Sequence, residues 1–148
     1  MKIDFGSGYN PKQGYKSCDF TENPILDFQV KNYKIYSDIN VELPQNSVDE
    51  FYVRNTLHHI KDLSLILQMF YFYLKNNGKL IIIDCRSDFY EKNLFLDKLW
   101  YRYIIPRPEI WFSNTYRNYK KIALKVGFKL IKEKIENEKE IFEFIKEN

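Results

Sequence analysis

A glycine turn that follows directly on a short apolar run is the feature that most constrains the fold of this chain. The run Lys2–Phe5 leads into Gly6-Ser7-Gly8, and a second short run ends in Asp19. Glycines after a strand let the backbone approach a ligand at a place where a Cβ would collide. A parallel α/β domain presents such a turn and such a carboxylate to a nucleoside-containing cofactor. We therefore expect a cofactor site at the ends of the first two strands.

The details of the turn disfavour a dinucleotide. In the dinucleotide fingerprint a third glycine permits tight packing of a helix, and the N–H groups at the start of that helix receive a pyrophosphate. Pro11 stands in the place of that glycine, and only six residues separate Gly8 from Tyr15. Six residues leave no room for a helix before the second strand. The turn therefore favours an adenosine cofactor without a pyrophosphate, and it argues against a nicotinamide oxidoreductase.

Acidic residues at two further strand ends fit an adenosine ligand. Asp19 is placed to accept hydrogen bonds from both hydroxyls of a ribose, which is a charge-assisted bidentate arrangement. Asp38 and Ile39 follow a predicted strand and are placed to contact the edge and the face of an adenine. A lone GxG is usually an ordinary tight turn, and a lone Asp is usually a solvated strand end. The combination, in this order, favours the cofactor site.

Hydrophobic periodicity predicts strands that alternate with helices, which is typical of a parallel sheet. Asp62 is expected to cap a helix that Gly78 stops, with Lys75 in its last turn. A second helix is expected over Asn114–Val126. The chain of 148 residues thus forms one domain, residues 1–148, with an α/β, Rossmann-like, mostly parallel sheet, helices on both faces and a closing antiparallel hairpin. The predicted strands are Lys2–Phe5, Tyr15–Asp19, Lys34–Ser37, Val48–Val53, Lys79–Cys85, Phe128–Ile135 and Ile141–Ile145.

Composition excludes several classes of protein. The two cysteines, Cys18 and Cys85, form no CxxC pair, so we expect neither a metal site nor a disulfide scaffold. The chain shows neither a membrane-length apolar run nor a basic leader with an apolar core, and we expect a cytoplasmic protein without a membrane partner. A net charge of +3 is modest for binding to nucleic acid.

The segments together resemble class I S-adenosylmethionine-dependent methyltransferases. The resemblance runs from Ile3 to about Asp84. The segments that carry it are DFGSGYNP, Asp19, Asp38-Ile39 with Leu43-Pro44, SVDEFYVRNTLHHIKD and LKNNGKLIIID. Near the end of the chain, ALKVGFKLI resembles the last helix and penultimate strand of that family. It implies S-adenosylmethionine as the cofactor and methyl transfer as the activity. The residues that it places around the cofactor are Asp4, Gly6, Ser7, Gly8, Asp19, Asp38, Ile39 and Asn55, and it places Arg54 beside Asn55 in the lining of the pocket at the end of the fourth predicted strand.

The chain departs from the family pattern at its start. Family members usually carry extra helical sequence before the first strand, whereas this chain is a short form that begins at Lys2–Phe5. We expect one of three consequences: an open site, a site that a second copy or a partner subunit covers, or lost catalysis. The last of these is the alternative function, a catalytically degenerate methyltransferase-like domain that binds or scaffolds a partner.

Two histidines follow the fourth predicted strand. His58 and His59 are adjacent, so on a helix their side chains project about 100° apart and at most one faces the pocket. The resemblance places His59 where the family often has a histidine. An imidazole there would accept a proton from an attacking hydroxyl or amine. The alternative is that it hydrogen-bonds backbone at the start of the helix.

The acceptor is expected to contact residues 86–112. Arginines beside aromatic side chains suit an anionic or sugar-like small molecule, and a sugar or surface-polysaccharide precursor is the leading interpretation. Methyltransferases of base amines carry an Asn/Asp-Pro-Pro-aromatic segment after the fourth strand, where this chain reads RNTL, so nucleic acid is not the expected substrate. The side chains that suggest the acceptor are Arg86, Tyr90, Trp100, Tyr101, Arg102, Arg107 and Trp111.

Overall fold

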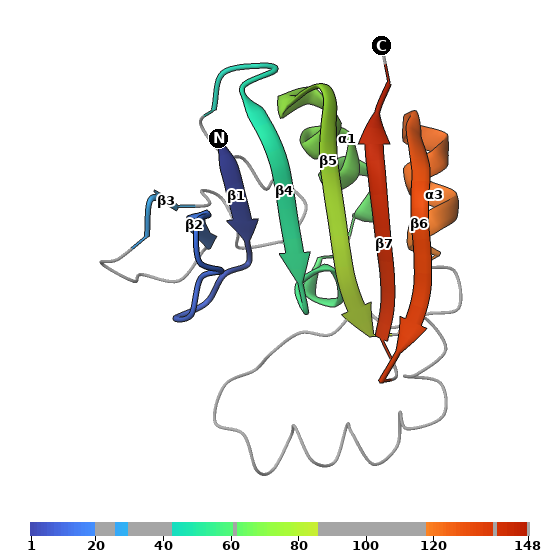
Figure 1. Cartoon of the computed structure of the whole chain (residues 1–148), viewed down its shortest axis with the longest axis horizontal. Coiled ribbons are helices and arrows are strands. Elements are labelled where there is room, and N and C mark those ends of the chain that lie inside the picture. Colours follow the sequence, from blue (N-terminus) through green and yellow to red (C-terminus); the bar gives the residue numbers. More distant parts are fainter. Residues whose placement is uncertain (20–25, 30–42, 61, 86–117, 138, 148) are drawn as a thin grey trace.

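One mixed sheet runs through the part of the chain that the computed structural model describes, which is residues 1–19, 26–29, 43–60, 62–85, 118–137 and 139–147. Its strand order is β3-β2-β1-β4-β5-β7-β6 (Figure 1). The strands from β3 to β5 are mutually parallel, and β7 is antiparallel to both β5 and β6. The strands are β1 (Lys2–Phe5), β2 (Lys16–Asp19), β3 (Phe28–Gln29), β4 (Val48–Arg54), β5 (Leu74–Cys85), β6 (Phe128–Glu136) and β7 (Lys139–Lys146).

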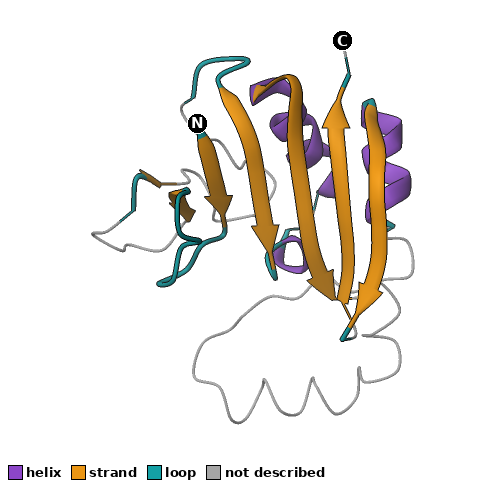
Figure 2. Cartoon of the chain, viewed as in Figure 1, coloured by secondary structure: helices purple, strands orange, loops and turns teal. Residues whose placement is uncertain are grey.

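Two α-helices lie side by side on one face of this sheet. They are α1 (Leu63–Tyr73) and α3 (Tyr119–Val126), and Figure 2 shows both behind the strands. A single 3-10 turn, η2 (Leu57–His59), links β4 to α1. Neither α-helix of the described residues lies on the opposite face. The Rossmann-like mixed sheet and its closing hairpin are therefore as predicted, and the described helices cover one side of it.

The core between sheet and helices is aromatic. Phe70 of α1 lies against Phe5 of β1 with ring centroids 5.0 Å apart, and against Phe51 of β4 at 4.7 Å. All three rings are buried, and Phe5 meets Phe70 edge to face, which is a favoured geometry for two rings. Leu63, Ile66, Leu67, Phe70 and Leu74 recur at helical spacing in the sequence, and all five are buried, although Leu74 belongs to β5.

The start of α1 is as predicted, whereas its end is not. Asp62 Oδ1 accepts a hydrogen bond from the Leu65 N–H at 2.9 Å, so Asp62 is the N-cap. The helix ends at Tyr73, because Leu74 is extended and pairs with Val48 in the sheet. The expectation that Lys75 lies in the last turn and that Gly78 stops the helix is therefore wrong. Strand pairing of the buried Leu74 outweighs the continuing helical pattern.

Lys146 supplies the cation at the end of α1. Its ammonium group donates to the carbonyl oxygens of Tyr71 at 2.7 Å and Leu74 at 2.8 Å, and to Asn46 Oδ1 at 2.8 Å. The last carbonyls of a helix lack partners within the helix, and a lysine that binds them also meets the negative end of the helix dipole. The last strand of the chain thereby fixes the end of a helix that lies far from it in sequence.

Other predicted boundaries differ in detail. The strand beside β2 is β3, Phe28–Gln29, whereas the strand predicted at Lys34–Ser37 lies outside the described residues. Asn118 caps α3 by accepting from the Lys121 N–H at 2.8 Å, and Gly127 ends it with a φ of 115°. The hairpin of β6 and β7 is confirmed.

The strand directions bring one edge of the sheet together. The parallel strands β1, β4 and β5 all end at the lower edge in Figure 1, and the turn between β6 and β7 lies at that same edge. Cys85, at the end of β5, pairs with Lys139, at the start of β7. Ligands of open α/β sheets bind at the carboxyl ends of the strands, so this edge is where a site is expected. In the described part of the chain, no helix combines the length and apolarity needed to cross a membrane.

Candidate cofactor and acceptor site

Backbone geometry builds the glycine turn after β1. Gly6 and Gly8 adopt φ values of 76° and 56°, which L-residues rarely adopt. The Gly6 N–H donates to the Cys18 carbonyl oxygen at 2.8 Å, which ties the turn to β2. A Cβ on Gly6 would lie 2.8 Å from Cβ of Thr56 and closer still to the rest of that side chain. Glycine is therefore required at residue 6 by both conformation and space.

Asp19 reaches the same turn from the end of β2. Its Oδ2 accepts a hydrogen bond from the Gly8 N–H at 2.6 Å, and the side chain is 5% exposed. A charge-assisted bond to a backbone amide fixes the direction of a carboxylate. The structure thus brings Gly6, Gly8 and Asp19 together, as the sequence predicted.

Ser7 leaves a hydroxyl group to be satisfied. Its Oγ is buried and has no hydrogen-bond partner within the described residues. Among the described residues, a Cβ on the adjacent Gly8 would meet nothing within 4 Å, so this part of the structure leaves space beside the turn. A buried polar group without a partner is costly unless a ligand or water satisfies it. The turn therefore has the room and the unused hydrogen-bonding capacity that a polar ligand requires.

Asp4 holds the segment that replaces the first crossover helix. Its Oδ2 accepts from the Lys12 N–H at 2.7 Å, and the side chain is 2% exposed. Burial raises the pKa of Asp4, and the bond from Lys12 and the positive charge of Arg54 partly offset that rise. The contact positions residues 9–15 over the sheet, and the predicted contact of Asp4 with a cofactor stays a prediction.

The loop between β1 and β2 packs through a lysine that lies between two tyrosine rings. Lys12 Nζ lies 4.5 Å from the ring centroid of Tyr15 and 3.9 Å from that of Tyr52. The Tyr15 hydroxyl donates to the Glu50 carboxylate. Burial, followed by this hydrogen bond, raises the pKa of Tyr15 well above its ordinary range. The expected loop between β1 and β2 is thus observed, and it packs by charge–aromatic contacts in place of a helix.

A buried histidine–carboxylate pair lies beyond β4. His58 Nδ1 is 2.6 Å from Asp84 Oδ1, and their side chains are 4% and 0% exposed. Asp84 Oδ2 also accepts from the N–H groups of Leu57 at 2.8 Å and Thr56 at 3.2 Å. One carboxylate at the end of β5 therefore fixes both η2 and the His58 ring, which favours a positioning role for His58.

His59 is the more accessible member of the predicted pair. Its side chain is half-buried, and its ring centroid lies 4.0 Å from that of His58. Its backbone N–H donates to the Thr56 carbonyl oxygen at 3.0 Å, as expected for a residue in the turn η2. His59 remains the candidate base, because the ring of His58 is directed to the buried Asp84.

Asn55 links β4 to the closing hairpin. It has a φ of 53°, and its N–H donates to the Ile83 carbonyl oxygen at 2.8 Å. Its side-chain Oδ1 accepts from Lys139 Nζ at 2.9 Å. Lys139 is at the start of β7, so the hairpin contributes a cation to the edge where β4 ends (Figure 1).

Comparison with known proteins decides the family. A family model described as a methyltransferase domain matches residues 10–133. The chain belongs to this methyltransferase family. Its fold is shared with an S-adenosylmethionine-dependent methyltransferase from Mesorhizobium loti, at a TM-score of 0.73 and 11% identity, over 99% of this chain and 90% of that chain.

Two further relatives are more distant or shorter in overlap. Human N-acetylserotonin methyltransferase, solved in complex with S-adenosylmethionine, matches at a TM-score of 0.61 and 18% identity, over 99% of this chain and 47% of that one. Phosphoethanolamine N-methyltransferase 3 of Arabidopsis thaliana is 45% identical over 47 residues, which are 31% of this chain and 10% of that protein. The chain thus matches only a tenth of the length of this curated relative.

The family is that of a methyltransferase domain, and the fold is shared with solved S-adenosylmethionine-dependent methyltransferases. In this methyltransferase the predicted adenine contacts, Asp38 and Ile39, lie outside the described residues, as does the predicted acceptor segment 86–112.

Two residues of the site were missed by the sequence analysis. Asp84 ends an apolar strand, and an acid in that position is a signal that sequence reasoning can use. Lys139 lies in a polar turn among other charges, and nothing in the sequence distinguishes it.

Proposed function

We infer that this methyltransferase transfers a methyl group from S-adenosylmethionine to a small-molecule acceptor. The observation that carries the proposal is the buried Asp19 carboxylate held at 2.6 Å by the Gly8 N–H of a two-glycine turn. Ser7 supports it, because its buried hydroxyl has no partner in the described part of the chain. The residues that would hold the cofactor are Gly6, Ser7, Gly8 and Asp19, with Asp38 and Ile39 proposed for its adenine.

The chemistry assigns a modest task to the protein. When bound, the cofactor supplies a methyl group on a positively charged sulfur, which is already activated for displacement. The side chains have to align the acceptor with that methyl group and exclude water. Asp19 orients the cofactor through its ribose, and the turn at Gly6 and Gly8 allows the backbone to approach closely.

His59 is proposed to receive the acceptor proton. A hydroxyl or neutral amine acceptor has to lose a proton as its lone pair forms the new bond to the methyl carbon and the bond from that carbon to sulfur breaks, and a neutral imidazole can take the proton. Its neighbour His58 is directed to Asp84, which holds η2 and thereby the backbone of His59. An acceptor that is already ionised needs no such base.

The identity of the acceptor is a separate part of the proposal. The sugar or surface-polysaccharide precursor rests on residues 86–112, which are not described here. The short match to a phosphoethanolamine N-methyltransferase supports a small polar acceptor more generally. The described residues contain no group of three or more His, Cys, Asp or Glu side chains that could hold a metal ion, so no metal is assigned a role.

Binding of the demethylated product tests the proposal. S-adenosylhomocysteine is expected to bind with a micromolar Kd in isothermal titration calorimetry, and Asp19→Ala to weaken it at least about 100-fold. Asp49→Asn is the matched control, because this exposed carboxylate lies at the opposite edge of the sheet. Absence of heat from the unmodified chain at high protein concentration contradicts the proposal. Binding without methyl transfer to any offered acceptor supports the degenerate-domain alternative.

A further inference from the structure

Several of the described lysines pair with a carboxylate, whereas Lys139, at the candidate site, binds an amide. Lys139 Nζ donates to the amide oxygen of Asn55, which is neutral. Within the described ranges, no carboxylate pairs with Lys139. An amide oxygen fixes the direction of an ammonium group without neutralising its charge. The lysines that do pair with carboxylates are Lys2, Lys16, Lys75, Lys120, Lys129, Lys132 and Lys134.

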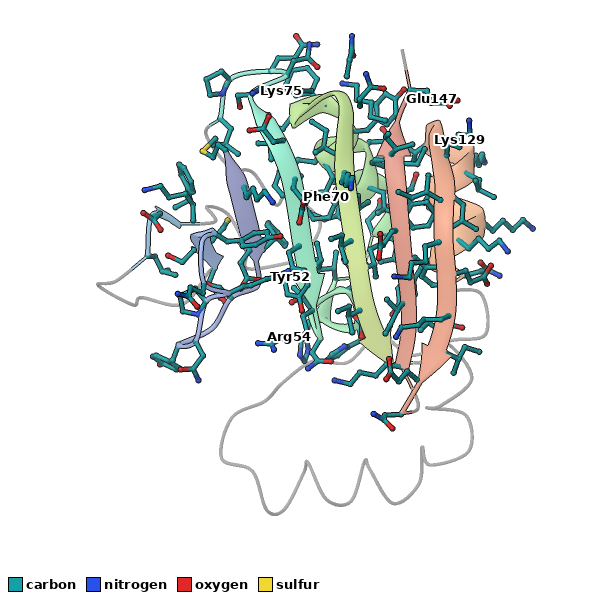
Figure 3. The ribbon with its side chains drawn as sticks, viewed as in Figure 1. Tyr52, Arg54, Phe70, Lys75, Lys129 and Glu147 are labelled. Carbon is teal, nitrogen blue, oxygen red and sulfur yellow. The ribbon has the colours of Figure 1, made fainter. Side chains whose placement is uncertain are left out.

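A second cation lies at the same edge of the sheet. Arg54 is the residue before Asn55, and its side chain is exposed at the carboxyl end of β4, where Figure 3 labels it. Its charge contributes to the electrostatics of Asp4, but the Asp4 carboxylate is buried and bonded to the Lys12 N–H. Among the residues that the structure describes, Arg54 forms no ion pair.

Sheet register places both cations on the same face. Arg54 is in register with Ile83, which is in register with Ile141. Lys139 lies two residues before Ile141, and residues two apart on a strand share a face. The neighbouring Glu140 is in register with the buried Asp84, on the face that carries the helices. Its carboxylate is therefore directed away from the two cations.

We propose that Arg54 and Lys139 form an oxyanion subsite for the methyl acceptor, which therefore carries a phosphate or a carboxylate group. Guanidinium and ammonium groups at one edge of a sheet are the usual donors to such groups, and arginine binds them through two parallel N–H bonds. Asn55, held at a φ of 53°, aims the lysine at this subsite. The inference rests on the proposed function, since it assigns these cations to the acceptor of that reaction.

The position of the subsite separates it from the cofactor residues. Gly6, Gly8 and Asp19 lie at the ends of β1 and β2, whereas Arg54 and Lys139 belong to β4 and β7. The cofactor turn therefore lies on the β1 side of the end of β4, and Lys139 lies on the other side, beyond β5. An acceptor anchored by its anion at β4 and β7 would direct its other end toward the turn.

Anion titrations test the subsite directly. Inorganic phosphate and acetate are titrated at pH 7.5 and constant ionic strength, with and without saturating S-adenosylhomocysteine, and followed by protein NMR shifts. We expect saturable binding of at least one anion, weakened about fivefold by Arg54→Gln and by Lys139→Gln. Asn55→Asp is expected to weaken it similarly, because the new carboxylate pairs with Lys139. Lys79→Gln is the matched control, since Lys79 is exposed at the opposite end of β5.

The outcomes separate this inference from the proposed function. Phosphate binding alone indicates a phosphorylated acceptor, and binding of both anions indicates a general oxyanion site. Equal binding by the unmodified chain, Arg54→Gln and Lys139→Gln overturns the subsite, as does an equal loss in Lys79→Gln. Weakened S-adenosylhomocysteine binding in Arg54→Gln also overturns it, because the cations then serve the cofactor carboxylate. Failure of S-adenosylhomocysteine to bind concerns only the proposed function, since the titration without it still reports on the subsite.

Discussion

The two halves of the carboxyl edge are built in different ways. On the cofactor side, the turn after β1 and the acid at the end of β2 are close in sequence, and backbone N–H groups hold them together. On the acceptor side, the contacts join residues far apart in the chain, as in His58 with Asp84 and Asn55 with Lys139. A site assembled from local backbone geometry can be recognised in a sequence, whereas one assembled from distant side chains requires the fold.

Of the two glycines in the cofactor half, Gly6 is expected to be the more sensitive to substitution. Gly6→Ala is expected to lower the free energy of unfolding by about 4 kcal/mol, because the new Cβ overlaps Thr56 and the φ is unfavourable. Gly8→Ala adds a Cβ in open space, so it is expected to cost about 1 kcal/mol from its φ alone. Chemical denaturation of both variants measures the difference, and equal losses would show that Thr56 yields to the new side chain.

Removal of one buried carboxylate breaks the acceptor half. Asp84→Ala leaves His58 and the N–H groups of Thr56 and Leu57 without their acceptor, and we expect a loss of about 3 kcal/mol in the free energy of unfolding. Affinity for S-adenosylhomocysteine in the folded variant is expected to change less than about threefold. Denaturation and calorimetry give the two values.

A matched variant separates the charge of Asp84 from its space. Asp84→Asn retains one acceptor oxygen, so its loss of stability is expected to be smaller than that of Asp84→Ala. A large loss of cofactor affinity in either variant would contradict the independence of the two halves.

An ion pair at the other edge of the sheet, far from the candidate site, serves as a control for the stability measurements. Lys75 Nζ donates to Asp49 Oδ1 at 2.8 Å, and this bond is the largest cause that lowers the pKa of Asp49 to about 2. A depressed carboxyl pKa stabilises the folded state above the ordinary value of 3.8, and this stabilisation is lost as pH falls toward 2. Both side chains are nearly half exposed, so Asp49→Asn is expected to cost under about 1 kcal/mol at pH 6.

Acid titration checks that baseline. The stabilities of the unmodified chain and of Asp49→Asn are expected to converge between pH 4 and pH 2, and ligand affinity at neutral pH is expected to stay the same. A difference that persists at pH 2 would show that the aspartate acts through something other than its charge.

Much of the fold could be predicted because its signals are local. The glycine turn, the cap at Asp62 and the apolar alternation of β6 and β7 each depend on a few neighbouring residues. The end of α1 could not be predicted in this way. Leu74 continues the helical pattern, yet it leaves the helix to pair with Val48, and Lys146 binds the carbonyls of the last turn.

The site shows the same division. Asp19 could be expected at the same edge as Gly8 because each comes at the end of a short strand, and the Gly8 N–H donates to its carboxylate; its contact with a ribose stays a prediction. Asp84 and Lys139 were missed because their partners are brought near only by strand pairing across β5. For the histidines, their spacing in the sequence indicates only that at most one of the two faces the site. The buried contact between His58 and Asp84 leaves His59 as the candidate for that role.

Gly6 and Thr56 impose a direction on how this site can evolve. Thr56 fills the volume that any side chain at residue 6 would need, so the two positions are linked although they belong to different turns. While residue 6 is glycine, a side chain at residue 56 meets no Cβ there, although a change at residue 56 gives up the hydrogen bond from the Thr56 hydroxyl to the Arg54 carbonyl oxygen at 2.9 Å. Replacement of Gly6 by another residue requires both a smaller side chain at residue 56 and a different backbone conformation at residue 6. Glycine at residue 6 is therefore difficult to replace by a single substitution. Sequence divergence in this methyltransferase is thereby expected to accumulate on the acceptor side, around a cofactor turn that stays fixed.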